Sequence, residues 1–290
     1  MEEISSPRKS IYQTGTPINI EGTYNFRSFG GYPSTIHPNR ITRHGLFYRS
    51  GHLEDITVRG LDQLHDLSIT KIINLATADE AKALFSESPT SPNSGQCTVH
   101  NLPLAKRGFS VQQLSEKYKR YLEEGETAIA QGYFKLLVEG HDVIRDILVL
   151  IRDNPNNVFL IHCSMGKDRT GIIFAVLLSL AGVPNDTIAT EYSLSESSLE
   201  IVLPEIAKAI RKAISPLLTE EEAMGRAKIV IKTSKEAMLL TLQMIEENFG
   251  STIEFLDRCC GIGSEDAKRI QDILTSTETR TSTGDLQEGR

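Results

Sequence analysis

The chain has 290 residues, and the 39% that are hydrophobic suffice for a sizeable core in one large domain or two modest ones. Its formal net charge of −7 argues against a protein that coats nucleic acid, because binding along a phosphate backbone needs concentrated Lys and Arg. The longest apolar run, residues 172–183, falls short of the roughly 20 residues that span a bilayer, so no transmembrane segment is expected.

The four cysteines are expected to be reduced. Cys97, Cys163, Cys259 and Cys260 lie in a long chain whose polar N-terminal sequence does not resemble a secretion signal, which predicts a cytoplasmic location. No pair of cysteines has the spacing of a zinc site, and His162 simply adjoins Cys163. The sequence therefore predicts neither a metal nor another cofactor.

Both ends of the chain are rich in polar residues. Residues 1–17 and 275–290 contain almost nothing to bury, and we expect a disordered arm and a disordered tail there. Between them the sequence contains no internal repeat and no long linker. It therefore predicts one domain over residues 18–274.

Four segments have the composition of buried strands. Their apolar residues run together instead of alternating, which is typical of a sheet covered on both faces, and helical segments separate them. The sequence thus predicts an α/β fold with a central parallel or mixed sheet of about four to five strands flanked by helices. The segments are residues 46–49, 71–75, 98–102 and 158–162.

Helical periodicity marks several longer segments. Residues 128–152 are predicted to be helical up to Asn154 and Pro155, and residues 171–181 read as a buried helix that ends at Gly182. Residues 184–274 are predicted to be all-helical. Helix caps are expected at Ser234 and Ser264 and, with Glu254 in a capping box, at Ser251.

The most informative stretch is VFLIHCSMGKDRTG, residues 158–171, in which a strand meets a glycine-containing turn and then a helix. Such a turn can surround an oxyanion with backbone N–H groups, while the helix N-terminus adds partial positive charge. We take 162–171 as the candidate catalytic loop. The amides expected to bind phosphate belong to Ser164, Met165, Gly166, Lys167 and Asp168.

Cys163 and Arg169 stand at the two ends of this loop. When the loop curls, the Cys163 sulfur comes beneath the phosphorus and the Arg169 guanidinium can bind two of its oxygens. A free thiol, with a pKa of about 8.5, is mostly neutral at pH 7, but loop amides and the helix dipole stabilise the thiolate. Cys163 is therefore the candidate nucleophile, and the Thr170 hydroxyl could bond its sulfur when that sulfur leaves.

The leaving group needs a proton and the attacking water needs a base. Asp168 is the nearest candidate, although the adjacent cations Lys167 and Arg169 make it a poorer acid. A carboxylate from the segment before the last strand is the alternative, and the candidates there are Glu123, Glu124, Asp142 and Asp146.

Other polar residues each have two interpretations. His162 either tunes the thiolate or orients the loop, and the structural role is favoured. Arg27 and Arg49 form either a structural ion pair, which is favoured, or a second anion contact. A cluster near the middle of the chain is either a basic lid or a solvated helix face, and its residues are Lys106, Arg107, Lys117, Tyr118, Lys119, Arg120 and Tyr121.

The loop HCSMGKDRTG resembles the active-site loop of the protein tyrosine phosphatase superfamily, and its Cys-x-x-Gly-Lys-Asp-Arg form resembles the atypical tyrosine and phosphoinositide phosphatases of bacterial and fungal type. Residues 25–31 and 45–50 are similar to that family's N-terminal motifs, so the resemblance covers roughly residues 18–275. It implies that Asp168 is the acid. Asn74, Leu75 and Ala76 depart from the family's usual Asp-Leu-Arg.

The loop favours a phosphomonoester hydrolase that acts through a phosphocysteine intermediate. Its predicted partners are phosphotyrosine proteins, with dual specificity open, phosphoinositides, or both. An extra loop cation at Lys167 slightly favours a multiply phosphorylated headgroup. Transient contact with a membrane surface and the oligomeric state stay open. The alternatives are a phosphate-binding module without turnover and a rhodanese-like sulfurtransferase.

Overall fold

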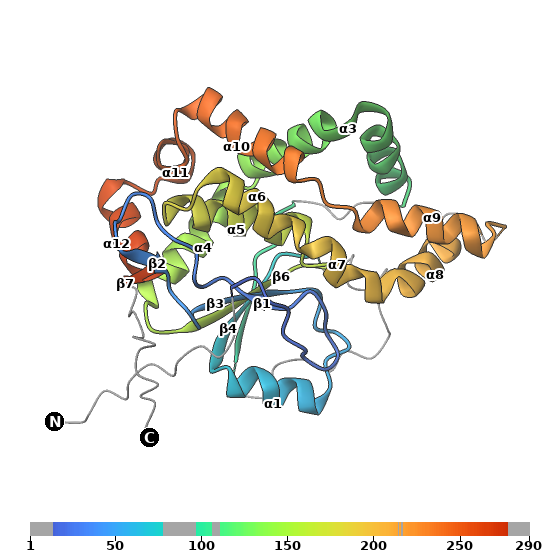
Figure 1. The fold of residues 1–290 in the computed structure, drawn as a ribbon, viewed down its shortest axis with the longest axis horizontal. Helices are drawn as coiled ribbons and strands as arrows, with labels where there is room; N and C mark the ends of the chain where they lie inside the picture. The colour runs from blue at the N-terminus through green and yellow to red at the C-terminus, as the bar shows by residue number, and fades with distance from the viewer. Residues whose placement is uncertain (1–13, 78–96, 106–110, 214, 216, 278–290) are drawn as a thin grey trace, which may run out of the picture.

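The structure, a computed structural model, describes residues 14–77, 97–105, 111–213, 215 and 217–277. Its central sheet has five strands in the order β1-β3-β6-β4-β5, of which β1 is antiparallel to its neighbour and the others are parallel (Figure 1). The predicted α/β class with a mixed sheet is confirmed. The strands are β1 (Arg27–Ser28), β3 (Phe47–Ser50), β6 (Val158–His162), β4 (Ile69–Asn74) and β5 (Thr98–Asn101).

Alternate strand residues enter two apolar clusters on opposite faces of the sheet. In β6, Phe159 and Ile161 join the large cluster, whereas Leu160 between them joins a smaller cluster that includes Leu64 of α1 (Val58–Asp66). Because both faces are covered, nearly every residue of β6 is buried, which explains its continuous apolar sequence.

Helices from residue 111 onward cover the face of the sheet that carries the larger apolar cluster. The helix α5 (Asp168–Leu180) follows β6 and is buried almost all round, between the sheet and the outer helices (Figure 1). Its predicted end at Gly182 is close to the observed one, but it begins at Asp168 instead of Gly171. The outer helices are α3 (Val111–Glu139), α4 (His141–Asp153), α6 (Asn185–Ser193), α10 (Lys235–Phe249), α11 (Thr252–Cys260) and α12 (Ser264–Leu274).

The single helix predicted over 128–152 is two helices, α3 and α4. They are separated at Gly140, whose ψ of 11° turns the chain, while its N–H still bonds to Leu136. A second break lies inside α3 at Gly125, which has φ +66° and ψ −147°, a conformation that favours glycine. Periodicity missed the break at Gly140 because the apolar spacing continues across it, whereas Gly125 lies before the predicted segment.

Two of the three predicted helix caps are confirmed. The hydroxyls of Ser234 and Ser251 accept bonds from the N–H groups of Ala237 and Glu254. Only this half of the capping box predicted at Ser251 forms, since the Glu254 carboxylate accepts from the Ser251 hydroxyl at 3.2 Å instead of from the Ser251 N–H. The prediction for Ser264 was wrong, since Ser264 is the first residue of α12 and Gly263 occupies the cap position without a side-chain bond. A capping box that we did not predict joins Thr219 and Glu222 at the start of α9 (Glu220–Ile231).

The ordered chain extends past both predicted ends of the domain. Pro17 bridges to Arg27, and β7 (Thr275–Thr277) pairs antiparallel with β2 (Arg40–Thr42), so the predicted disorder was wrong for residues 14–17 and 275–277. Disorder was predicted because these segments are polar and contain few side chains to bury. However, an edge strand needs only backbone partners, and Arg40 also donates to the carbonyl of Thr275.

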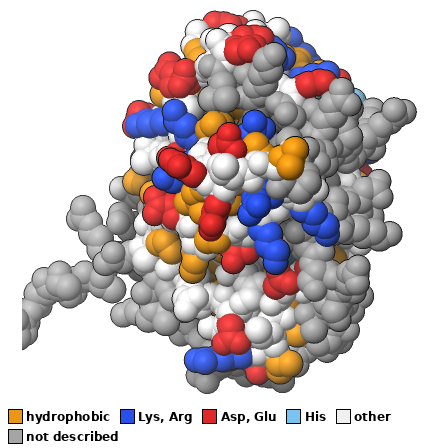
Figure 2. Space-filling model, turned by 90° about the vertical axis from the view of Figure 1, so that its right-hand side faces the viewer, with side chains coloured by type: hydrophobic (Ala, Val, Ile, Leu, Met, Phe, Trp, Pro, Cys, Tyr) orange, Lys and Arg blue, Asp and Glu red, His pale blue; other side chains and the backbone are white. Residues whose placement is uncertain are grey.

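The segment after α6 extends to one side of the molecule (Figure 1). It contains α7 (Ser195–Leu199), a 3₁₀ turn (Glu200–Val202), α8 (Leu203–Ala213) and α9, and the last two pack against each other. The face that carries α8 and α9 mixes acidic, basic and apolar side chains (Figure 2). Of the helices described, none combines the length and hydropathy needed to cross a bilayer.

Candidate active site

The loop between β6 and α5 is closely packed against the neighbouring strand β3. Gly166 has φ +64°, and a Cβ placed there would lie 2.1 Å from the carbonyl oxygen of Ser50. Only glycine satisfies both the backbone conformation and this close approach. The loop therefore turns sharply at Gly166, and α5 begins two residues later.

Arg169 reaches back across the loop to the residue that follows Cys163. Cys163 directly follows β6 and is only 3% exposed. From the first turn of α5, Arg169 reaches back so that Nη2 donates to Oγ of Ser164 at 3.1 Å and Nη1 to the Leu75 carbonyl at 3.3 Å. The guanidinium thus lies against the residue that follows the cysteine.

The carbonyl groups of the loop accept hydrogen bonds from side chains behind it. The Tyr24 hydroxyl donates to the Ser164 carbonyl at 3.0 Å, and Nδ2 of Asn25 donates to the carbonyls of Met165 and Gly166, each at 3.0 Å. Nη2 of Arg49 donates to Gly166 at 2.7 Å and to Lys167 at 3.3 Å. These donors come from segments more than one hundred residues away in the sequence.

A buried carboxylate joins the two arginines behind the loop. Glu191 accepts from Nε of Arg27 at 2.8 Å and from Nη1 of Arg49 at 2.6 Å, and both guanidinium groups are fully buried. Burial alone would raise the pKa of Glu191, but the two arginines hold it below its ordinary value. Burial, with Arg49 nearby, lowers the pKa of Arg27 to about 10, which leaves it charged at neutral pH.

This arrangement agrees with the favoured interpretation of Arg27 and Arg49, a structural ion pair. Their common partner Glu191 was not predicted, because it lies in the helical sequence NDTIATEYS, which carries no motif. Only the two arginines in the N-terminal motifs indicated that a buried acid was needed.

Asp168, the first residue of α5, binds two tyrosines in series. The Tyr133 hydroxyl donates to Oδ1 of Asp168, and the hydroxyls of Tyr133 and Tyr192 are 2.6 Å apart. Burial, and then the charge of Asp168, raise the pKa of both tyrosines well above the ordinary value. They therefore stay protonated, with Tyr192 donating to Tyr133. This pair was not predicted, because nothing in the sequence distinguishes these tyrosines from other aromatic residues at helical spacing.

The ammonium group of Lys167 points to the end of α9. It donates to the carbonyls of Val230 at 2.5 Å and Lys232 at 3.1 Å and lies 3.5 Å from Oδ1 of Asp168. The expectation of an extra loop cation is therefore weakened, because these carbonyls and Asp168 engage the charge. The backbone N–H of Lys167 remains a candidate donor to phosphate.

His162 and Thr170 flank the loop from inside the core. Burial lowers the pKa of His162 to about 4, so its imidazole is neutral at pH 7 and brings no positive charge to the cysteine. This favours the structural interpretation of His162. The buried Thr170 hydroxyl has no hydrogen-bond partner within the described residues.

The alternative acids have other partners. Glu124 binds Arg120, and Asp142 and Asp146 both bind Arg145 at the start of α4. Glu123 is exposed, so Asp168 remains the best placed carboxylate. In the basic cluster, Lys106 and Arg107 lie outside the described residues, as do the side chains of Lys117, Tyr118 and Lys119, so the choice between lid and solvated face stays open.

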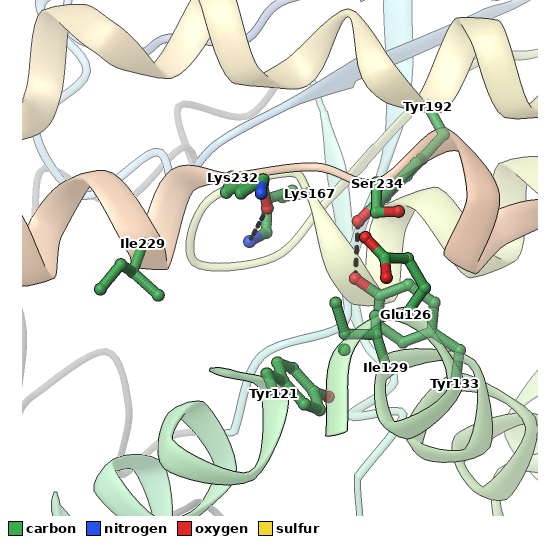
Figure 3. Close-up of a pocket in the computed structure, with 10 residues that line it drawn as sticks. Tyr121, Glu126, Ile129, Tyr133, Lys167, Tyr192, Ile229, Lys232 and Ser234 are labelled. Atoms are coloured by element: carbon green, nitrogen blue, oxygen red, sulfur yellow. Dashed lines mark hydrogen bonds between the residues drawn. The ribbon is translucent and has the colours of Figure 1, made fainter. Parts of the chain in front are cut away.

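A pocket of about 80 Å³ opens beside the loop (Figure 3). Tyr121, Ile129 and Tyr133 of α3 line one side, and Lys167 and Lys232 lie across from them. Its walls thus combine aromatic and aliphatic surface with a polar rim. In the described part of the chain, no three His, Cys, Asp or Glu side chains form a group that could hold a metal ion.

Comparisons with known proteins identify the family of the chain. The model of the tyrosine phosphatase family matches residues 18–276. The chain is 24% identical to the triple specificity protein phosphatase PtpB of Mycobacterium tuberculosis, over 88% of this chain and 98% of the relative. It is 29% identical to a tyrosine-protein phosphatase of Nostoc commune, over 53% of this chain and 49% of the relative. The chain therefore belongs to the tyrosine phosphatase family and is a cysteine-dependent phosphatase.

Proposed function

We propose that the protein hydrolyses phosphomonoesters through a phosphocysteine intermediate formed on Cys163. The observation that carries this proposal is the position of Arg169, whose guanidinium folds back onto Ser164 beside the cysteine at the start of α5. A nucleophile, a guanidinium fork and a helix N-terminus thereby meet around one loop, which suits a tetrahedral dianion.

In the first step, the Cys163 thiolate attacks phosphorus and the bond to the ester oxygen breaks. Asp168, in its protonated form, gives its proton to the departing oxygen, so that an alcohol or phenol leaves. Arg169 and the loop amides of residues 164–168 bind the nonbridging oxygens, where charge accumulates in the transition state.

In the second step, water attacks the phosphocysteine and Asp168 accepts its proton. The bond between sulfur and phosphorus breaks, inorganic phosphate leaves, and the sulfur returns as a thiolate. The Thr170 hydroxyl, which is buried without a partner among the described residues, is available to donate to that sulfur. Both steps use only side chains, backbone amides and water.

Phosphotyrosine proteins, phosphoinositides or both are the proposed substrates. The name of the mycobacterial relative, a triple specificity phosphatase, supports a broad range. The pocket beside the loop supports an aromatic leaving group, because Tyr121, Ile129 and Tyr133 offer flat apolar surface next to Lys167. The contacts of the Lys167 ammonium give no preference for a multiply phosphorylated headgroup.

A phosphate-release panel tests this proposal. Wild type and Cys163→Ser are given phosphotyrosine, phosphoserine and phosphothreonine peptides and phosphoinositide vesicles, and inorganic phosphate is measured. We expect release by wild type from at least one class, with a loss of at least about 1,000-fold in Cys163→Ser. Binding without release would indicate a phosphate-reading module, and turnover of thiosulfate that vanadate does not inhibit would indicate a sulfurtransferase.

A further inference from the structure

Every loop carbonyl from Ser164 to Lys167 accepts a hydrogen bond from a donor behind the loop. Tyr24 and the N–H of His52 bind the first, Asn25 binds the next two, and Arg49 binds the last two. Four consecutive peptide groups are therefore held by donors that come from outside the loop.

The geometry of the peptide group means that these bonds also set the direction of the loop N–H groups. In a planar trans peptide, the C=O of one residue and the N–H of the next point in opposite directions. Carbonyls of residues 164–167 that point to the rear therefore turn the N–H groups of residues 165–168 to the front, the side on which phosphate is bound.

We propose that Asn25 and Arg49 are positioning residues for phosphate transfer, which hold the loop amides toward the phosphate by binding the carbonyls behind them. The inference rests on the proposed function. Loop peptides without these donors can rotate so that a carbonyl oxygen faces the phosphate, which would repel the anion.

Buried ionic contacts fix the two positioning residues. Glu191 binds Arg49 at 2.6 Å and Arg27 at 2.8 Å, and Nη1 of Arg27 in turn donates to Oδ1 of Asn25 at 2.5 Å. Ser195 accepts a further bond from Arg27 at 3.0 Å. The amide group of Asn25 is thereby oriented with its NH₂ toward the loop.

The same network places net positive charge behind the anion site. Two guanidinium groups share one carboxylate, Glu191, in a region where these side chains are at most 2% exposed. Charges in such an environment are weakly screened by solvent and salt. Arg49, which touches the loop directly, thus contributes charge as well as orientation.

The test compares the affinity for tungstate, which mimics the bound phosphate, with the kinetics of phosphate release. Asn25→Ala removes both amide donors. Arg49→Lys keeps the charge but loses the planar group whose Nη2 binds two loop carbonyls while its Nη1 binds Glu191. We expect each variant to weaken tungstate binding at least about 10-fold and to lower kcat about 10- to 100-fold, with a smaller change in KM.

A stability-matched control separates positioning from folding. Thr42→Val, in β2, removes buried bonds to Phe29 and Tyr32 without touching the loop. Its melting temperature should fall, while its tungstate affinity and kcat stay close to those of wild type. Asn25→Asp retains the shape and the oxygen that accepts from Arg27, so it serves as the folded variant even if Asn25→Ala unfolds.

The outcomes distinguish this inference from the function on which it rests. Folded Asn25→Asp and Arg49→Lys proteins that bind tungstate and turn over like wild type would overturn the positioning role alone. Losses in Thr42→Val as large as those in the two loop variants, at equal stability, would also overturn it. A wild type that neither binds tungstate nor releases phosphate would instead contradict the proposed function.

Discussion

The network behind the loop and the α8–α9 pair differ in how they are held. Behind the loop, Arg27, Arg49 and Glu191 come from three elements, are almost fully buried and bind each other through short ionic contacts. Between α8 and α9, the buried cluster consists of three alanines, and Leu217 in the connection is 91% exposed. The buried ionic contacts hold the network in one arrangement, whereas the α8–α9 pair buries little apolar surface.

The two regions meet the loop in different ways. The network contacts its carbonyls at several points, while α9 reaches it through the ammonium of Lys167 and the carbonyls of Val230 and Lys232. We therefore expect substitutions in the network to change both stability and chemistry. Substitutions in the α8–α9 pair should stay local.

The largest effect is expected from Glu191→Ala, which leaves two buried guanidinium groups without their carboxylate. The free energy of unfolding should fall by about 3–5 kcal/mol, as for other buried ion pairs that lose one partner. Urea denaturation at pH 7 measures this loss. A loss below about 1 kcal/mol would show that this network stabilises the fold no more than a surface salt bridge does.

His162 should make the free energy of unfolding depend on pH in the acid range. Since burial lowers its pKa from 6.5 to about 4, the unfolded chain binds a proton there that the folded chain does not. The free energy of unfolding therefore contains a contribution from His162 that is complete above pH 6.5 and is lost as the pH falls toward 4. A pKa shift of this size corresponds to about 3 kcal/mol.

The slope of unfolding free energy between pH 6.5 and pH 5 measures the effect. His162→Gln should flatten that slope. Equal slopes in wild type and His162→Gln would show that His162 is as easily protonated in the fold as in the unfolded chain.

Tyr133→Phe tests the contact between α3 and Asp168. The variant removes the donor to Asp168 while keeping the buried ring. We expect kcat to fall about 10-fold for peptide phosphates, equivalent to about 1.4 kcal/mol, because the Asp168 carboxyl loses the bond that orients it. The loss should be smaller for activated aryl phosphates, whose leaving group needs no proton. An equal loss with both substrates would separate Tyr133 from proton transfer.

The smallest effect is expected from Thr219→Ala, which removes the capping box of α9. Amide exchange in the first turn of α9 should report a local loss of about 1 kcal/mol. Tungstate affinity and kcat should remain as in wild type. A marked loss of either would show that the α8–α9 pair takes part in the chemistry and would end the comparison.

The features that could be predicted lie close together in the sequence. Residues 158–171 contain β6, the loop and the start of α5 in one run, so the apolar strand, Gly166 and the Cys163–Arg169 spacing were all visible together. The four predicted strands all occur in the central sheet, with shifts of a few residues at their ends.

What the sequence did not predict depends on contacts between distant segments. Glu191 and Tyr133 meet their partners across more than thirty residues, and nothing local distinguishes them from other helical residues. The direction of the Lys167 ammonium depends on where α9 ends. Likewise, β7 exists because β2 offers it a partner, although its own residues are polar.

The most direct test of the central claim is to find the phosphoryl group on the enzyme. Wild type is mixed with a phosphate ester, quenched in acid during turnover, digested and analysed by mass spectrometry. We predict one phosphoryl group on the peptide that contains Cys163, attached to its sulfur. Steady phosphate release with that peptide unmodified throughout, and with Cys163→Ser as active as wild type, would contradict the account.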